Sequence, residues 1–208
     1  MLPLTLNLRG RSVVVIGGGN VGARKAAAAL AAGATVRVVD PRTPLALPPD
    51  AAHAPETYRP DHLDGAALAF ACATPDVNAR VATDARAKGV WVSSASAPDD
   101  GDFTLPAVVR RGDLLLTVST GGASPALARR VREKLESEYD GAFAEWVRLL
   151  AEVRQEVLAA VPDEARRREL LDGFAGWEWL ARLRADGAEK VREALRAVLS
   201  GPRPGGGE

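Results

Sequence analysis

The sequence has one cysteine and two histidines among its 208 residues. The lone cysteine, Cys72, excludes an intrachain disulfide and a metal site built from several cysteines. His53 and His62 lie nine residues apart in a proline-rich region, without another histidine or cysteine at ligand spacing. We therefore expect exposed structural roles for both histidines and predict no metal site.

The sequence also lacks a net charge and a long apolar run. Its 27 Lys and Arg residues balance its 27 Asp and Glu residues, which gives no sign of a broad nucleic-acid-binding surface. No apolar run approaches bilayer-spanning length, and the N-terminus does not have the pattern of a signal peptide. We expect one or two domains in a cytoplasmic protein that binds neither nucleic acid nor membrane.

A glycine-rich turn follows a strand-like run near the N-terminus. The β-branched residues 13–16 lead into G-x-G-x-x-G, formed by Gly17, Gly19 and Gly22, and a helix-favouring stretch covers residues 23–32. In such a turn the first glycine permits the tight bend, the second lets the backbone approach a pyrophosphate, and the third lets helix and strand pack closely. The N–H groups at the helix start would face the anion.

An acidic residue follows at the expected distance. Residues 35–39 are typical of a second strand after a helix cap at Gly33, and Asp40 lies at its end, where a carboxylate accepts hydrogen bonds from an adenosine ribose. The sequence therefore predicts an NAD site, although Arg37 and Arg42 weaken the preference against a 2′-phosphate. The expected cofactor-binding residues are Gly17, Gly19, Asn20, Val21, Gly22, Asp40, Arg42, Thr43 and Thr74.

Strands and helices alternate in the first half of the chain. Apolar residues 68–73 and 90–92 favour strands, and residues 77–88 between them favour a helix closed by Gly89. This order predicts an α/β fold with a right-handed, parallel, Rossmann-like sheet. The proline-rich residues 41–55 are expected to form a loop, and residues 2–8 an edge strand or a lead-in segment.

The second half has a different character. Residues 103–109 and 114–119 favour a β-hairpin, and Ser124 with a following proline favours the start of a helix that continues to about Glu136. An apolar stripe over residues 143–161 predicts another helix, whose partner is either the same chain or a second copy. The expected division is an NAD-binding domain at 1–102, a dimerisation and substrate region at 103–137, a helical domain at 138–200 and a flexible tail at 201–208.

Two loops have residues suited to chemistry. Residues 93–102 are rich in hydroxyls and acids, and would either place a proton acceptor beside a nicotinamide ring or form an ordinary acidic surface loop. Residues 119–122 precede a helix and would either bind carboxylates through exposed N–H groups or simply connect a strand to that helix.

Several stretches taken together resemble one family. They are Leu-Pro-Leu at 2–4, residues 17–25, 63–65, 73–74 with 78–80, 103–107, and, most specifically, 119–129 with 132–136. Over residues 1–160 the chain resembles the precorrin-2 dehydrogenase / sirohydrochlorin ferrochelatase family, which forms the N-terminal module of siroheme synthases. The siroheme synthase methyltransferase domain is not expected, because the chain ends too soon.

The resemblance implies a specific activity. Family members oxidise the tetrapyrrole precorrin-2 to sirohydrochlorin with NAD, and some insert Fe2+, which is then a substrate rather than a bound cofactor. It also implies a homodimer joined through the region after the Rossmann half, with the active cleft between the subunits. The substrate has eight carboxylates, which suits the turn before the predicted helix. The expected substrate-binding residues are Ser119, Thr120, Gly121, Gly122 and Ser124.

The chain departs from the family at one catalytic position. The family usually has Asn-Val-Val-Asp ahead of its Phe-x-x-Pro strand, and here Ser96 stands where that aspartate is expected. Since a serine hydroxyl is no general base near neutral pH without an activator, a carboxylate of the same loop is the expected substitute. The candidate catalytic residues are Ser96, Asp99, Asp100 and Asp102. The alternatives are a non-catalytic tetrapyrrole- or NAD-binding protein and a dimeric NAD-sensing regulator.

Overall fold

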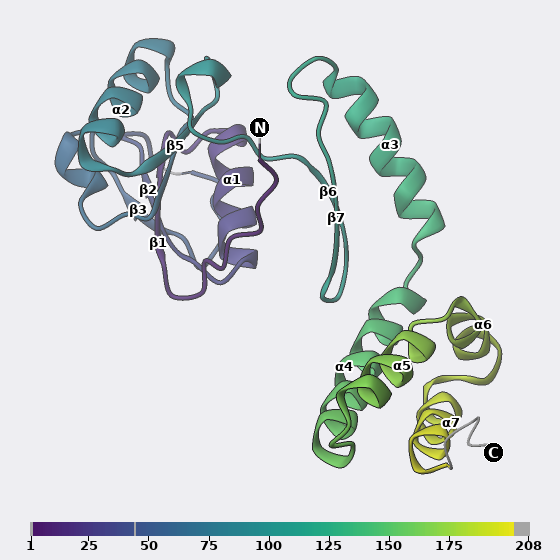
Figure 1. The fold of residues 1–208 in the computed structure, drawn as a ribbon. Coiled ribbons are helices and arrows are strands. Elements are labelled where there is room, and N and C mark those ends of the chain that lie inside the picture. Colours follow the sequence, from purple (N-terminus) through teal and green to yellow (C-terminus); the bar gives the residue numbers. More distant parts are fainter. Residues whose placement is uncertain (1, 44, 202–208) are drawn as a thin grey trace. The chain divides into compact units, whose positions relative to one another are not determined.

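The computed structural model describes residues 2–43 and 45–201, except for the side chain of Pro98, and Figure 1 traces its elements. Most of the predicted tail, residues 202–208, lies outside the described residues. The chain forms two compact units, one ending at Leu105 and the other beginning at Pro106. The divisions expected at residues 102 and 137 stay predictions.

The first unit is built on one parallel sheet. Its strands are β1 (Ser12–Ile16), β2 (Thr35–Val39), β3 (Ala52–Ala54), β4 (Leu68–Ala71) and β5 (Trp91–Ser94), in the order β3-β2-β1-β4-β5. The predicted Rossmann-like sheet is therefore confirmed. From β1 the chain adds β2 and β3 on one side, and it then returns to add β4 and β5 on the other side. In such sheets, ligands bind outside the carboxyl ends of the strands at this switch point, here between β1 and β4.

Two helices cover opposite faces of this sheet. Alternate residues of β1 point to opposite faces, so Val13 and Val15 pack with buried alanines of α1 (Asn20–Ala31). Val14 packs on the other face, against buried residues of α2 (Pro75–Lys88). Two short 3-10 turns complete the unit, η1 (Pro60–Leu63) and η2 (Pro98–Asp100).

For this unit, two local predictions were wrong, and the structure decides a third that had been left open. Residues 41–55 contain the strand β3, although a loop was expected. Hydrogen bonds to β2 stabilise this three-residue Ala-His-Ala strand, which its own sequence does not predict. Residues 2–8 form no strand and are a lead-in segment. His62 is buried, at 5% exposure, although an exposed position was expected, because its segment packs beneath α2.

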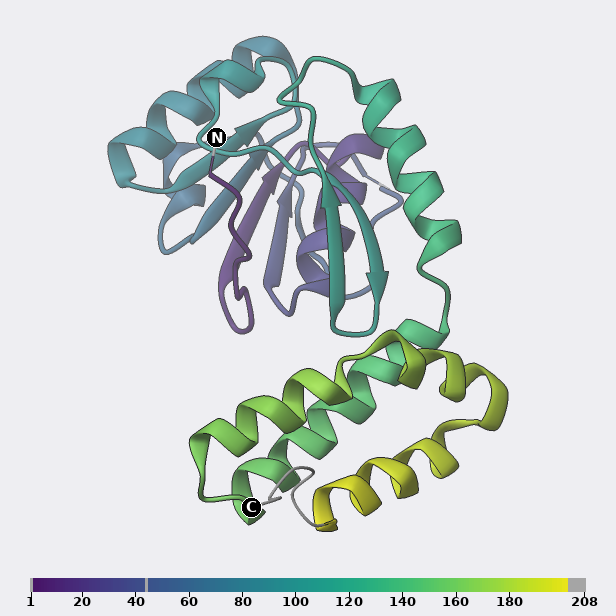
Figure 2. The same ribbon diagram turned by 45° about the vertical axis from the view of Figure 1, so that its right-hand side comes forward.

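The second unit begins with a hairpin and a helix. β6 (Ala107–Arg111) and β7 (Leu114–Val118) pair in antiparallel fashion, and α3 (Pro125–Glu138) lies beside them, as Figures 1 and 2 show. The predicted hairpin is confirmed, but its first strand begins at Ala107. Phe103, expected in that strand, belongs to the first unit, where its ring packs edge to face on that of Phe70, with ring centroids 5.5 Å apart.

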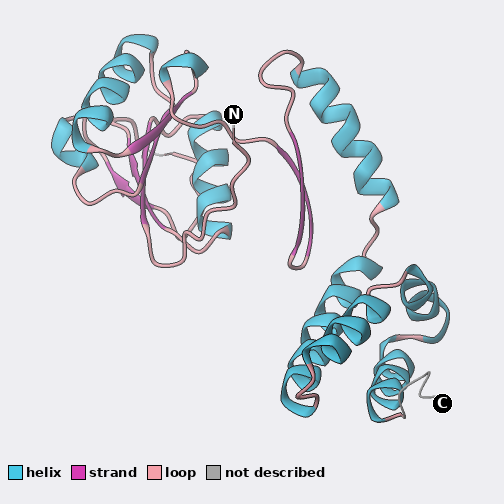
Figure 3. Ribbon diagram, in the orientation of Figure 1, coloured by secondary structure: helices cyan, strands magenta, loops and turns pink. Residues whose placement is uncertain are grey.

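Four further helices complete the second unit, and Figure 3 distinguishes them from the strands. They are α4 (Ala142–Ala160), α5 (Glu164–Phe174), α6 (Trp177–Asp186) and α7 (Ala188–Ser200). The apolar stripe of α4 is buried against the other three helices, so its partner surface lies within the chain. Among the described residues, no helix is long and apolar enough to cross a membrane.

Candidate functional site

The glycine-rich loop is held between its neighbouring strands. The N–H of Gly17 donates to Val39 O at 2.9 Å, and the N–H of Cys72 donates to Ile16 O at 2.7 Å. Gly17 has φ +100°, and a Cβ there would lie 2.5 Å from the carbonyl oxygen of Cys72. Only glycine fits this position, because both the dihedral and the close approach exclude a side chain.

Gly22 and Gly19 differ in what surrounds them. A Cβ on Gly22 would overlap the carbonyl oxygen of Gly17, so this glycine lets α1 pass directly behind the loop. Gly19 is the N-cap of α1, and the nearest described atom to its missing Cβ, beyond its chain neighbours, is Nη2 of Arg42 at 3.8 Å. The space in front of Gly19 is therefore a cradle that a side chain would fill.

The first turn of α1 has the features of an anion-binding site. Within the described chain no side chain caps this helix, and its first turn has no acidic residue. The first N–H groups of a helix lack intrahelical partners and bind phosphates readily. Asn20 and Val21 lie exposed in this turn, as a residue beside a pyrophosphate must. The loop therefore fits a dinucleotide.

Asp40 is buried beside this loop and fully hydrogen bonded. Its Oδ2 accepts from Gly18 N–H at 2.7 Å and from Nη2 of Arg42 at 2.7 Å. Its Oδ1 accepts from the backbone N–H and the Nε–H of Arg42, both at 2.9 Å. Hydrogen bonding to the Arg42 side chain, together with the two backbone N–H groups, holds the pKa of Asp40 well below its usual range.

The strand end that presents Asp40 has a further support. Nε2 of His53, on β3, lies 2.9 Å from the carbonyl oxygen of Asp40, so this ring nitrogen donates its hydrogen. Thr43 is exposed one residue beyond Arg42. The Asp40–Arg42 pair and the contribution of Gly18 were not foreseen, because they depend on how the loops meet in space.

The β4–α2 turn brings a second group of residues to the same edge. Asn78 is 1% exposed, and its Oδ1 accepts from Ala73 N–H at 2.8 Å. Its Nδ2 donates to Ser96 Oγ at 3.0 Å, which ties the β4–α2 turn to the loop after β5. Thr74 is the exposed N-cap of α2, and no side-chain cap bond occupies its hydroxyl within the described chain.

Asn78 is the functional candidate that the sequence analysis passed over. The available signal was an asparagine at the start of a helix that directly follows a strand end. The structure shows that this amide is buried, and buried amides are hydrogen bonded. Through Asn78, Ser96 lies at the strand-end edge that also holds Thr74.

The three acidic candidates of the 93–102 loop have different environments. Asp102 has its Oδ2 2.9 Å from the N–H of Val92, near the beginning of β5, and its carboxylate therefore fixes the returning loop to the strand. Asp99 and Asp100 are exposed in η2. The structure thus gives Asp102 a structural contact and leaves the other two at the surface.

The predicted substrate turn lies in the second unit. Ser119 Oγ accepts from Gly121 N–H at 3.2 Å, and Thr120 Oγ1 accepts from Ser124 N–H at 3.1 Å. Ser124 caps α3 as predicted, accepting from Leu127 N–H at 3.2 Å. These hydroxyl oxygens satisfy backbone N–H groups expected to bind anions, while each hydroxyl keeps a hydrogen to donate.

Burial shifts the pKa of two side chains in the first unit, Lys25 and Cys72. Burial lowers the pKa of Lys25, whose Nζ lies 5.7 Å from the centroid of the Phe70 ring. Burial raises the pKa of the Cys72 thiol to about 11, against the lowering effect of Lys25. Cys72 is therefore a neutral thiol near pH 7.

Histidine geometry differs from that of a metal ligand. Nδ1 of His62 accepts from Arg59 N–H at 3.0 Å, so Nε2 carries the hydrogen, 3.5 Å from a Glu56 carboxylate oxygen. Over the described residues, no group of three His, Cys, Asp or Glu side chains could hold a metal ion.

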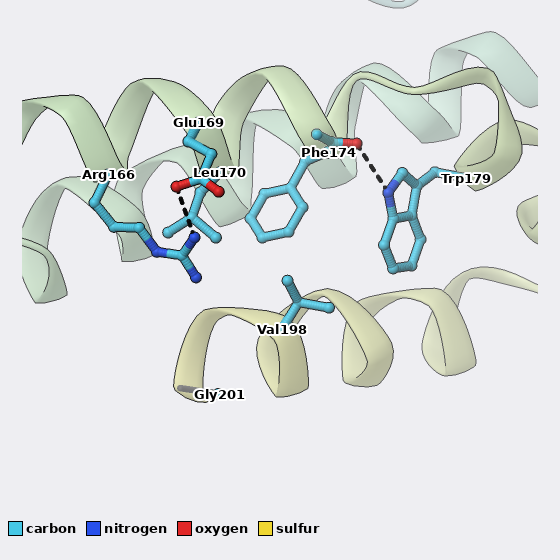
Figure 4. A pocket seen from close by; sticks show the side chains of 8 residues that line it. Arg166, Glu169, Leu170, Phe174, Trp179, Val198 and Gly201 are labelled. Atoms are coloured by element: carbon cyan, nitrogen blue, oxygen red, sulfur yellow. Dashed lines mark hydrogen bonds and ion pairs between the residues drawn. The ribbon is translucent and has the colours of Figure 1, made fainter. Parts of the chain in front are cut away.

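A separate pocket of about 420 Å³ lies in the helical part of the second unit (Figure 4). Leu170, Phe174 and Val198 line it, with Trp179, whose Nε1 donates to Gly173 O at 3.0 Å. Its charged lining, Arg166 and Glu169, is paired at 2.9 Å. The pocket is apolar, without the anion-binding features of the glycine loop.

Comparison with known proteins agrees with this geometry. A family described as putative NAD(P)-binding matches residues 4–107, and one described as the central part of sirohaem biosynthesis proteins matches residues 111–138. A solved structure, SirC, precorrin-2 dehydrogenase, has a TM-score of 0.75 and 25% identity, covering 94% of this chain and 99% of that one. The chain belongs to the precorrin-2 dehydrogenase and siroheme synthase family.

Curated relatives support the same assignment. The siroheme synthase of Azotobacter vinelandii is 34% identical over 98% of this chain and 45% of its own length. The siroheme synthase of Methylococcus capsulatus is 37% identical over 99% of this chain and 46% of its own length. The chain therefore spans about half the length of these relatives.

Proposed function

We propose that this chain is a dehydrogenase that oxidises precorrin-2 to sirohydrochlorin with NAD. The observation that carries the proposal is the cradle at Gly19, bordered by the uncapped start of α1 and by Asp40, in a chain of this family. NAD, when bound, would supply the hydride acceptor, so that the substrate would lose a hydride and a proton and NADH would form.

The chain's own residues have separate roles in this proposal. Gly19 and the first turn of α1 bind the pyrophosphate, and Asp40 with Arg42 faces the adenosine ribose. Asn78 holds Ser96 and the β4–α2 turn in place at the nicotinamide end of the crevice. It acts as a positioning residue.

The proton acceptor is assigned to Asp99 or Asp100. Both carboxylates are exposed in the loop that contains Ser96, whereas the Asp102 carboxylate already accepts the N–H of Val92. An exposed carboxylate is free to approach a bound substrate and to accept its proton.

The carboxylates of the substrate are assigned to the turn that precedes α3. Gly121 and Gly122 have φ +62° and +89°, which turns the backbone sharply, and the hydroxyls of Ser119, Thr120 and Ser124 have hydrogens to donate. Tetrapyrrole carboxylates accept such hydrogen bonds.

A homodimer is part of the proposal. The two-stranded β6–β7 hairpin packs against α3, yet these elements leave large apolar side chains exposed to solvent. Val108, Leu127 and Val131 are 41%, 53% and 37% exposed on the hairpin and α3. We assign this surface to a second copy. In light scattering, Leu127→Asp should convert a dimer to a monomer, and a wild-type monomer would contradict the assignment.

The direct test is anaerobic incubation with precorrin-2 and NAD. We expect sirohydrochlorin absorbance and NADH absorbance to rise together in a 1:1 ratio. NAD binding without either rise would refute the dehydrogenase and favour the alternative function, a tetrapyrrole- or NAD-binding protein, which the serine at position 96 supports.

The same assay identifies the base. Asp99→Asn together with Asp100→Asn should lower turnover by about 100-fold or more, the usual contribution of a general base. Asp113→Asn with Asp50→Asn, also exposed, is the matched control for the loss of two charges. Unchanged turnover in the Asp99 and Asp100 double variant would remove both residues as bases.

Iron insertion is a second proposed activity, with Fe2+ as a substrate. The siroheme synthases among the relatives support it, since siroheme contains iron. Anaerobic mixing of Fe2+ with sirohydrochlorin should form siroheme faster with the protein than without it, and equal rates would refute it. A cytoplasmic location, also proposed, is tested by cell fractionation.

A further inference from the structure

At the adenosine end of the cofactor site, the carboxylate of Asp40 already accepts as many hydrogen bonds as it has lone-pair sites. Asp40 accepts four N–H donors, three of them from Arg42 and one from Gly18, at 2.7 to 2.9 Å. A carboxylate has about four lone-pair sites. A ribose hydroxyl can therefore bind Asp40 only by displacing one of these donors.

The charge at this position is also not that of a lone carboxylate. Arg42 pairs with Asp40 at 2.7 Å, so the two side chains together carry no net charge, and the N–H of Gly18 adds a partial positive charge. The usual reason why an acidic residue rejects a 2′-phosphate is repulsion of its two negative charges. Pairing with Arg42 removes most of that repulsion.

Arg42 has unused capacity to bind an anion. Its side chain is 67% exposed, and Asp40 takes hydrogens from Nε and Nη2, two of the five N–H hydrogens of a guanidinium. Nη2 lies 3.8 Å from where a Cβ of Gly19 would stand, so the guanidinium borders the pyrophosphate cradle. Exposed Thr43 adds a hydroxyl beside it.

We infer that this site accepts NADP as well as NAD, and that Arg42 holds the 2′-phosphate of NADP. The inference rests on the proposed function, since it concerns the cofactor of the same dehydrogenase. A planar guanidinium can bind a phosphate with two parallel hydrogen bonds. The hydrogen bonds from Nε and Nη2 to Asp40 leave three N–H hydrogens of Arg42 for this purpose. Arg42 is thus the residue that determines cofactor specificity.

The test is calorimetric binding of NAD and NADP to the full chain without tetrapyrrole, with adenosine 5′-monophosphate and adenosine 2′,5′-bisphosphate as smaller probes. We expect the Kd of NADP to lie within about tenfold of that of NAD, a difference of one charge-assisted contact or less. Arg42→Gln should raise the Kd ratio of NADP to NAD by at least about tenfold, and Arg42→Lys should restore part of it.

Arg86→Gln is the matched control, because Arg86 is exposed in the last turn of α2, at the end of the helix away from the strand-end crevice. It should leave the ratio unchanged. A wild-type Kd ratio of NADP to NAD above about tenfold, or equal ratios in the Arg42→Gln and Arg86→Gln variants, would overturn the inference.

A second variant keeps the test decisive if Arg42→Gln unfolds. Asp40→Asn frees Arg42 from its ion pair and should shift the ratio toward NADP by about tenfold, and no shift would overturn the inference. The results of this test can be told apart from those that bear on the proposed function. NAD binding and precorrin-2 oxidation without NADP binding refute only the inference, and binding of both nucleotides without oxidation refutes only the dehydrogenase.

Discussion

The glycine loop allows a variant that removes cofactor binding without removing the fold. Gly19→Ala places a methyl group in the cradle, where the nearest described atom is Nη2 of Arg42 at 3.8 Å. The backbone there has φ −69° and ψ −177°, which alanine adopts without strain. The fold therefore has room for the methyl group, and a pyrophosphate in the cradle does not.

Two opposing effects set the change in the free energy of unfolding of Gly19→Ala. Alanine is a poorer N-cap than glycine, by about 1 kcal/mol or less, and restricts the unfolded chain, which returns roughly 0.4–1 kcal/mol. We therefore expect the free energy of unfolding of Gly19→Ala to change by less than about 1 kcal/mol. The Kd of NAD should rise by at least about tenfold, since the helix N–H groups can no longer reach the phosphates.

Gly22→Ala is the matched comparison. Its Cβ would overlap the carbonyl oxygen of Gly17, so the loop or α1 must move, and overpacking of this kind costs about 1–3 kcal/mol or more. Urea unfolding gives the stabilities, and calorimetry gives the NAD affinities. The reasoning is refuted if Gly19→Ala binds NAD as tightly as the wild type, or if it destabilises the protein as much as Gly22→Ala does.

Three other predictions concern stability and protonation. Asp102→Ala should lower the free energy of unfolding by about 1 kcal/mol in urea, because Val92 N–H loses its acceptor, and an unchanged stability would contradict the contact. Alkylation of Cys72 by iodoacetamide should reach half its maximal rate near pH 11, since burial raises the thiol pKa to that value, and a midpoint near 8.5, the usual thiol value, would contradict the burial. Asp40 has a folded-state pKa below its unfolded value, so its contribution to stability is present above about pH 4 and is lost as the pH falls further. Acid unfolding should therefore begin at higher pH in Arg42→Gln, where that pKa is less depressed, and identical acid unfolding would contradict the pairing.

The parts of the fold that the sequence predicted depend on neighbouring residues. The strand, turn and helix at residues 12–31 arise from a β-branched run, three spaced glycines and an alanine-rich stretch. Ser124 caps α3 through a bond that spans three residues. Such local signals need no knowledge of tertiary structure.

The parts that it missed depend on residues far apart in the chain. β3 exists because it pairs with β2, and Phe103 leaves its expected strand because Phe70 provides an aromatic contact. The bond from Asn78 to Ser96 joins residues 18 positions apart. Neither spacing nor composition records these contacts, because they form only when loops after different strands meet at one edge of the sheet.

The acidic candidates illustrate how contacts separate roles that composition cannot. Asp40 pairs with Arg42 beside the glycine loop, and the Asp102 carboxylate holds Val92 N–H. Each carboxylate is therefore held by contacts within the fold, and neither is free to approach a substrate. Asp99 and Asp100, by contrast, lie exposed in η2. A base supplied by this loop must therefore come from η2, which is why the double variant there decides between a dehydrogenase with a relocated base and a protein that binds without catalysing.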